Sequence, residues 1–264
     1  MSLVEIIILG IVQGLTEFFP VSSSGHLVLF QNLFGFQEPQ ILADIMLHVG
    51  TVISLLAFVR KELIALITGF GRFCARPKHH IHDPQIRTLF FLFLASIPTA
   101  CIGYFFHDFF LSLFASLRAV GVALFITGGF LLSTRFAQEK ENESILHPVL
   151  IGTLQALAIV PGLSRSGMTI GGALLLGWKR KRAAQFSFLL SIPAILGAAV
   201  FELKNAELTS LSWPLLLFGA LVSAVTGFIA LVFLVRLINR GKFFSFSFYC
   251  FLAGAVALIV SFLL

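Results

Sequence analysis

Residues 10–26 read GIVQGLTEFFPVSSSGH, and residues 152–169 read GTLQALAIVPGLSRSGMT. When the chain is shifted by 142 positions, six residues of the first stretch fall on identical residues of the second without a gap. Most of these identities are polar or small residues inside apolar sequence, so they indicate an internal repeat. The repeated residues are Gly10, Gln13, Leu15, Ser22, Ser24 and Gly25 in the first copy and Gly152, Gln155, Leu157, Ser164, Ser166 and Gly167 in the second.

Both stretches contain residues that break a helix. Pro20 precedes three serines and Pro161 precedes a glycine; proline removes a backbone donor, and Gly and Ser favour turns. The apolar arms 6–16 and 166–178 would form helices of roughly 16 Å and 20 Å, too short for roughly 30 Å of hydrocarbon. The two stretches therefore predict re-entrant hairpins, which are tolerated at membrane depth only where protein or a water-filled cavity surrounds them.

The composition is that of a membrane protein. Of the 264 residues, 58% are hydrophobic and 11% are charged, and the mean hydropathy is +1.00; a soluble domain has about 25% charged residues. The uncharged stretches match the roughly 20 residues that a membrane helix needs, and the alternation of membrane barrel strands is missing. We predict an all-α polytopic membrane protein with a single membrane domain, 1–264. About six full spans are expected, near 41–59, 86–106, 117–134, 183–201, 213–236 and 245–264.

The positions of Lys and Arg distinguish a hairpin from a crossing for the second repeat copy. If residues 145–178 return to the side that they entered, 15 of the 18 Lys and Arg lie on one side of the membrane, six of them in the loop 60–87. A single crossing would divide them 9 against 8, so the positive-inside rule favours the hairpin. The same rule explains the net charge of +6, and we expect no nucleic-acid partner.

Together the two hairpins predict an inverted-topology repeat. Hairpin 2–34 would enter from outside and hairpin 145–178 from the cytoplasm, with repeat halves of about 1–134 and 145–264. Repeats of this kind place a shared site near the bilayer midplane, where the broken helices meet.

Three ionisable residues lie inside the two motifs: Glu17, His26 and Arg165. Ionisable residues within membrane segments are costly to bury and are therefore functional candidates. The alternative is a Glu17–Arg165 ion pair that only braces the hairpins. That alternative leaves the surrounding serines and glycines unexplained.

The residues around these charges suit phosphate chemistry. Where a helix restarts, backbone N–H groups, hydroxyls and a guanidinium together bind phosphate well. A serine beside a histidine can act as a nucleophile with its general base, and we expect Ser23 to be the nucleophile and His26 the base. The predicted phosphate-binding residues are Ser22, Ser24, Gly25, Ser164, Ser166, Gly167 and Thr169.

A divalent cation is also expected at this site. Gln13 and Glu17 are one helical turn apart, and an acid and an amide oxygen on one face suit Mg²⁺ or Ca²⁺. The same pair would equally suit orienting His26. Asp44 and His48 are one turn apart in the span 41–59, and whether they line the cavity is left open.

The motifs closely resemble those of the undecaprenyl-diphosphatase family of bacterial membranes, also called bacitracin-resistance proteins. The first motif, QGLTEFFPVSSSGH (13–26), and the second, PGLSRSGMT (161–169), both match, and the resemblance covers the whole chain. It implies hydrolysis of undecaprenyl diphosphate to undecaprenyl phosphate and inorganic phosphate, which recycles the lipid carrier for peptidoglycan and other envelope polymers. It also implies bacitracin resistance, divalent-cation dependence, and a multi-pass protein of the bacterial inner membrane whose site opens to the periplasmic face.

The resemblance also assigns roles to residues. Many members have Glu at the position of Gln13, which weakens a metal role there. The expected partners are a polyprenyl diphosphate and membrane lipid, and a homodimer is left open. Glu17, Ser23, His26 and Arg165 fall on catalytic positions, and Ser22, Ser164, Ser166 and Thr169 fall on phosphate-binding positions.

Two other kinds of protein share some of these features. Type-2 phosphatidate phosphatases also have SGH and SR elements, but they need a histidine where this chain has Gly171, so that family is rejected. A transporter or flippase of a polyprenyl phosphate would share the broken helices and the phosphate-binding motifs. A carrier has no need of the Ser23 and His26 pair, however, which favours the phosphatase.

Overall fold

The computed structural model describes residues 1–36, 40–114, 116–140, 143–203 and 212–263. These residues form helices and connecting turns, with no strand among them. The helices are α1 (Leu3–Phe18), α2 (Ser23–Leu33), α3 (Ile41–Phe58), α4 (Arg60–Ala75), α5 (Pro77–His80), α6 (Pro84–Phe105), α7 (His107–Phe114), α8 (Leu117–Ser133), η1 (Thr134–Phe136), α9 (Leu146–Leu157), α10 (Arg165–Leu175), α11 (Arg180–Leu203), α12 (Trp213–Asn239), η2 (Phe243–Ser245) and α13 (Phe246–Leu263).

Six of the described helices are long and apolar enough to cross a membrane. They are α3, α6, α8 with η1, α11, α12, and η2 with α13, and they contain from 18 to 27 residues. At about 1.5 Å per residue they reach roughly 27 to 40 Å, enough for the hydrocarbon core. The predicted all-helical, multi-pass membrane fold with six spans is confirmed.

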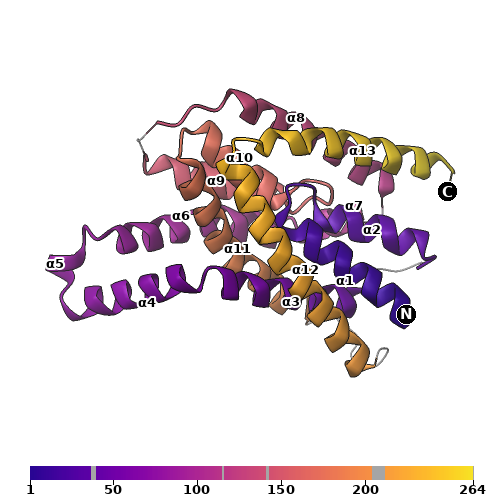
Figure 1. Cartoon of the computed structure of the whole chain (residues 1–264), viewed down its shortest axis with the longest axis horizontal. Coiled ribbons are helices and arrows are strands. Elements are labelled where there is room, and N and C mark those ends of the chain that lie inside the picture. The colour runs from indigo at the N-terminus through magenta and orange to yellow at the C-terminus, as the bar shows by residue number, and fades with distance from the viewer. Residues whose placement is uncertain (37–39, 115, 141–142, 204–211, 264) are drawn as a thin grey trace.

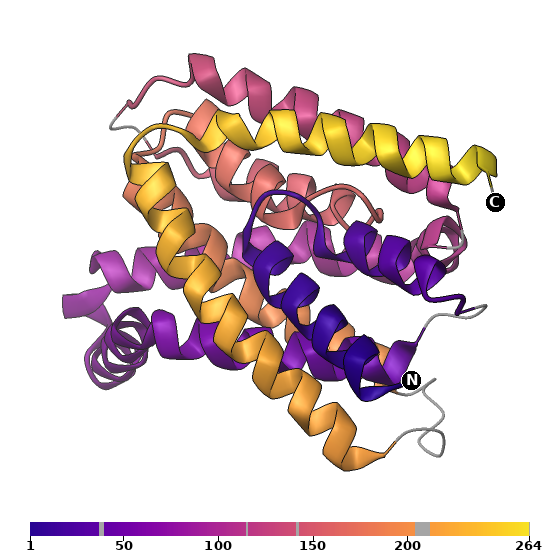
Figure 2. The ribbon, with the colours of Figure 1, turned by 45° about the vertical axis from the view of Figure 1, so that its right-hand side comes forward.

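The remaining helices near the motifs are shorter. Figure 2 shows α1 and α2 as one helical hairpin, and α9 and α10 form the second. Re-entry into the bilayer stays a prediction, as do the single membrane domain and its division into two repeat halves. The residues 60–87, treated above as a loop, instead form the helices α4 and α5 and the start of α6.

Each hairpin packs its first arm against a full span. Helix α1 lies on α12, and α9 lies on α6. Glycines permit these close approaches: a Cβ added at Gly14 would lie 2.7 Å from the carbonyl oxygen of Ser223, and one at Gly152 would lie 2.1 Å from that of Ala95. No side chain larger than hydrogen fits at these crossings, which fixes where each motif ends up.

Different helices lie at the two ends of the molecule. Figure 1 shows the beginning of α1 and the end of α13 at one end, whereas α4 and α5 project at the other. An apolar core around the buried side chains of Trp178, Phe186 and Leu190 holds α10 and α11 against their neighbours. The hairpin tips lie between these ends, surrounded by the spans (Figure 2).

Candidate functional site

The two motifs touch each other at their helix breaks. The backbone N–H of Gly162 donates to the Ser22 hydroxyl oxygen at 3.0 Å, and the Ser166 hydroxyl donates to the carbonyl oxygen of Phe19 at 3.1 Å. These bonds join residues 140 and 147 positions apart, so the two motifs lie in contact, as the repeat predicted. The depth of that site in the bilayer stays a prediction.

Both breaks end in the same helix cap. Ser22 caps α2 and accepts the N–H of Gly25 at 3.3 Å, and Ser164 caps α10 and accepts the N–H of Gly167 at 3.1 Å. Ser22 has φ +67°, a left-handed conformation that is uncommon for residues other than glycine and that occurs at functional sites. A second hydroxyl lies beside each cap, with Ser24 3.3 Å from Ser22 and Ser166 3.2 Å from Ser164.

Glu17 is the centre of the site. Its carboxylate is buried, and its Oε1 accepts a hydrogen bond from Nη1 of Arg165 at 2.8 Å. Its Oε2 accepts from Nε2 of Gln13 at 2.9 Å and from the Ser23 hydroxyl at 2.6 Å, and Nε2 of His48 lies 3.6 Å away. A single carboxylate therefore joins side chains of α1, α2, α3 and α10.

His26 lies in the site but is turned away from the predicted nucleophile. Its Nδ1 lies 2.8 Å from the carbonyl oxygen of Ser22, and its Nε2 lies 2.7 Å from the Tyr249 hydroxyl on α13. The expected Ser23–His26 hydrogen bond is therefore not formed. Ser23 is the first residue of α2 and points back to Glu17, whereas the His26 ring bonds to the turn preceding its own helix.

The structure also places Thr169 and shows residues that the motifs alone did not reveal. The Thr169 hydroxyl donates to the carbonyl oxygen of Arg165 at 2.8 Å and lies 2.5 Å from the Ser187 hydroxyl of α11. Thr127 of α8 donates to the carbonyl oxygen of Gly162 at 2.9 Å and accepts from the N–H of Ser164 at 3.2 Å. The roles predicted for these side chains stay predictions.

His48, Thr127, Ser187 and Tyr249 share one sequence signal. Each is a polar residue inside an apolar span. That signal is weak, because most single hydroxyls in a membrane helix bond only to their own backbone, as Ser96 and Ser261 do here. Only the open question about His48 pointed toward the site.

The cavity at the site is small. Glu17, Arg165, Ser166, Ser187 and Ser191 line about 10 Å³ of space, which is about the volume needed for one water molecule. A diphosphate therefore enters only if side chains or helices move apart.

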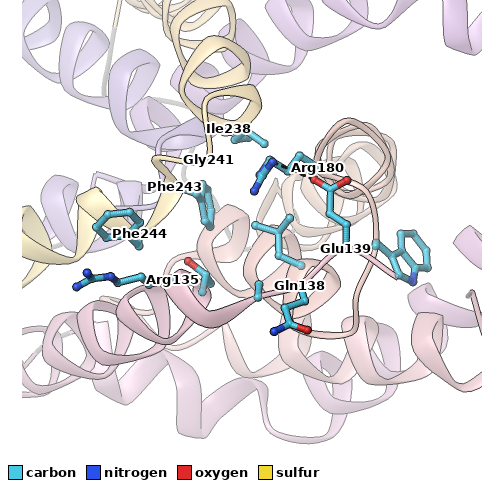
Figure 3. A pocket seen from close by; sticks show the side chains of 12 residues that line it. Arg135, Gln138, Glu139, Arg180, Ile238, Gly241, Phe243 and Phe244 are labelled. Atoms are coloured by element: carbon cyan, nitrogen blue, oxygen red, sulfur yellow. Dashed lines mark ion pairs between the residues drawn. The ribbon is translucent and has the colours of Figure 1, made fainter. Parts of the chain in front are cut away.

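A larger cavity, of about 50 Å³, lies elsewhere. Figure 3 shows Arg180 paired with Glu139 in it, and Arg135 near the Phe244 ring. It contains none of the predicted site residues. Its size alone does not make it the functional site.

A divalent cation fits the Glu17 cluster if the substrate supplies further ligands. Gln13 is completely buried, and its Oε1 has no hydrogen-bond partner. In the described part of the chain no three His, Cys, Asp or Glu residues gather as a ready-made metal site. Cations such as Mg²⁺ are commonly held by one or two protein carboxylates and by substrate phosphates, and Glu17 with the Gln13 oxygen suits that pattern.

The similarity to known proteins decides the family. A family model described as bacitracin resistance protein BacA matches residues 6–256. The chain belongs to this family. Its BacA relatives include the undecaprenyl-diphosphatase of Desulfatibacillum aliphaticivorans, 43% identical over 99% of this chain and 100% of the relative. The undecaprenyl-diphosphatase of Carboxydothermus hydrogenoformans is 40% identical over 98% of both chains, and that of Methanobrevibacter smithii is 39% identical over 99% of this chain and 98% of the relative.

BacA membership confirms the resemblance inferred from the motifs. Both motifs lie within the matched residues, and the similarity to the three relatives runs through nearly the whole chain. The two motifs that meet in the structure therefore both lie within the part of the chain that matches the BacA family.

Proposed function

We propose that this BacA protein hydrolyses undecaprenyl diphosphate to undecaprenyl phosphate and inorganic phosphate. The relatives' names support the reaction and the substrate. The observation that carries the proposal in this chain is the line of bonds from Ser23 through Glu17 to Arg165. It joins a hydroxyl and a guanidinium, both partly buried, to one fully buried carboxylate that can accept a proton.

The geometry favours Glu17 over His26 as the group that takes the proton of Ser23. Ser23 Oγ would attack the terminal phosphorus, and its proton would pass to Glu17 Oε2, 2.6 Å away. The anhydride bond to the lipid phosphate breaks, and undecaprenyl phosphate leaves. Water then hydrolyses the phosphoserine and releases inorganic phosphate.

Arg165 stabilises the charge that develops on the phosphoryl oxygens. A guanidinium offers two parallel donors in a fixed plane, which matches phosphate geometry. The N–H groups at the starts of α2 and α10 add donors and the positive end of each helix dipole. His26, with Tyr249 at its Nε2, is placed to protonate the leaving group or to activate water.

A divalent cation would be held by Glu17 with the Gln13 oxygen. When bound, such an ion neutralises diphosphate charge and polarises the phosphoryl oxygens. Glu17 would then share its two oxygens among the ion, Arg165 and Ser23.

We place the protein in the bacterial inner membrane, with its site opening to the periplasmic face. The expected partners are the polyprenyl diphosphate and membrane lipid, and a homodimer stays a prediction. The reaction would recycle the carrier for peptidoglycan synthesis and confer resistance to bacitracin. A polyprenyl-phosphate flippase is not favoured, because the relatives are named as diphosphatases.

The test is phosphate release from undecaprenyl diphosphate by purified protein in detergent. Ser23→Ala should abolish release and should also abolish a trapped ³²P adduct. A phosphoserine survives acid and is cleaved by alkali, whereas a phosphohistidine does the reverse. An acid-labile adduct in Ser23→Ala would make His26 the nucleophile, an active Ser23→Ala without any adduct would favour direct attack by water, and no release by the native chain would refute the proposal.

A further inference from the structure

The His48 ring is held in one orientation by a backbone carbonyl. Its Nδ1 lies 2.7 Å from the carbonyl oxygen of Asp44. A carbonyl oxygen only accepts hydrogen bonds, so Nδ1 carries the proton. In the neutral ring the other nitrogen, Nε2, then has a free lone pair, which is the arrangement of most metal-binding histidines.

The free nitrogen faces the buried carboxylate. His48 Nε2 lies 3.6 Å from Glu17 Oε2, and the side chains are 24% and 1% exposed. Two acceptor atoms that face each other repel unless a positive charge lies between them. Two ligands each about 2.1 Å from one cation lie at most about 4.2 Å apart, so one ion can bind both atoms at the observed separation.

The Gln13 amide could supply a further ligand to an ion at Glu17. Gln13 donates from Nε2 to the same Glu17 Oε2 at 2.9 Å, while its own Oε1 is buried without a hydrogen bond. Rotation of this amide by 180° would exchange the two atoms and present the oxygen to a cation at Glu17. Buried acceptors are normally satisfied, but the Gln155 oxygen also lacks a partner, so Gln13 supports a cation at Glu17 only through this rotation.

We propose that His48 Nε2 is a nitrogen ligand of the cation at this site, together with Glu17 and Gln13, and that the site prefers Mn²⁺ or Co²⁺ to Ca²⁺. An imidazole nitrogen suits first-row transition metals, whereas Mg²⁺ and Ca²⁺ take oxygen ligands. The inference rests on the proposed function, because diphosphate oxygens would complete the ligand set.

The internal repeat provides a natural control. Gln155 occupies the repeat position of Gln13, and its Oε1 also has no partner. Its Nε2, however, donates to the Thr99 hydroxyl at 3.0 Å, and the contacts described for it include no carboxylate or imidazole. If an unpartnered amide oxygen were enough to bind the ion, Gln13 and Gln155 would both bind it. We expect binding only at Gln13, where Glu17 and His48 add their ligand atoms.

The experiment measures Mn²⁺ binding by electron paramagnetic resonance on purified, chelator-stripped protein, alone and with methylenediphosphonate. Spin-echo modulation should show a coordinated ¹⁴N nucleus. His48→Gln should remove that signal and weaken Mn²⁺ binding at least tenfold, while the exposed His79→Gln should change neither. Gln13→Met should weaken binding, whereas Gln155→Met should not.

The outcomes separate this inference from the proposed reaction. Mn²⁺ bound without ¹⁴N modulation, or no Mn²⁺ bound under either condition, would overturn the nitrogen ligand. So would a folded His48→Gln that binds Mn²⁺ as tightly as the native chain; His48 would then act as a cation beside Glu17. Phosphate release in Mg²⁺ is measured on the same samples, and its presence would leave the diphosphatase standing.

Discussion

Glu17 has two carboxylate oxygens, and four side chains compete for them. Removing one partner leaves a buried charge less compensated, which is costly. Substitutions around Glu17 therefore affect folding as well as chemistry, and each test needs a variant that keeps the charge.

Arg165→Lys keeps the charge and loses the planar pair of donors. We expect kcat/KM for phosphate release to fall by about 10² or more, the scale of losing one transition-state donor. The control is Arg135→Lys, which alters an exposed arginine at the larger cavity. Near-normal activity of Arg165→Lys would mean that Arg165 only braces the hairpins.

Tyr249 is the only described side chain that hydrogen-bonds His26 Nε2. Tyr249→Phe removes that donor and keeps the stacked ring, so we expect kcat to fall about tenfold, equivalent to one hydrogen bond of about 1.4 kcal/mol. KM should change little if Tyr249 only positions the imidazole. The exposed Tyr104 supplies the control, as Tyr104→Phe should have full activity; equal effects of both would show that the loss is general.

The sequence predicts most of the residues that meet at the site, but not the hydrogen bonds between them. Glu17, Ser23 and Arg165 were grouped correctly because they lie in short motifs rich in helix-breaking residues. The direction of the Ser23 hydroxyl could not be inferred, since it depends on how α2 leaves the turn. Tyr249 lies 223 positions from His26, and its only local signal is that it is a polar residue in an apolar span.

At the scale of elements, the six spans were predictable because length and apolarity alone define them. Helix α4 differs from the loop that the charged residues of 60–87 predict. Its exposed Ile64, Ile67 and Phe70 repeat at helical spacing, which was the available signal. Contacts between elements could not be predicted, because the helices that cross closely at glycines are far apart in the sequence.

Helix α9 tests the importance of those crossings. Gly152→Ala would place a methyl group 2.1 Å from the Ala95 carbonyl oxygen, so we expect a loss of about 1–3 kcal/mol from overpacking. A Cβ added at Gly197 on α11 would meet nothing within 4 Å, so Gly197→Ala should stabilise its helix by up to about 1 kcal/mol. Thermal unfolding in detergent measures both. If Gly152→Ala and Gly197→Ala had equal melting temperatures, α9 and α6 could move apart at no cost in stability.

For the whole molecule, the main untested prediction is which segments face the cytoplasm and which face the outside. In a variant without its three native cysteines, single cysteines at Pro77 and Lys181 should react only from the cytoplasm. A cysteine at Leu263, at the end of α13 and at the same end of the molecule as the start of α1 (Figure 1), should react from outside. Labelling of Lys181→Cys from outside would refute the second hairpin.

The hydrogen bond from Gly162 to Ser22 can form only after both residues have been synthesised. The ribosome makes the donor 140 residues after the acceptor, which at about 5–20 residues per second takes roughly 7–28 s. During that interval Ser22 lacks the Gly162 donor and Glu17 lacks the Arg165 guanidinium. Unsatisfied polar groups are costly in the hydrocarbon of the membrane. We therefore expect the first hairpin to stay in the watery interior of the insertion machinery until the second emerges, so that the segment made first enters lipid late.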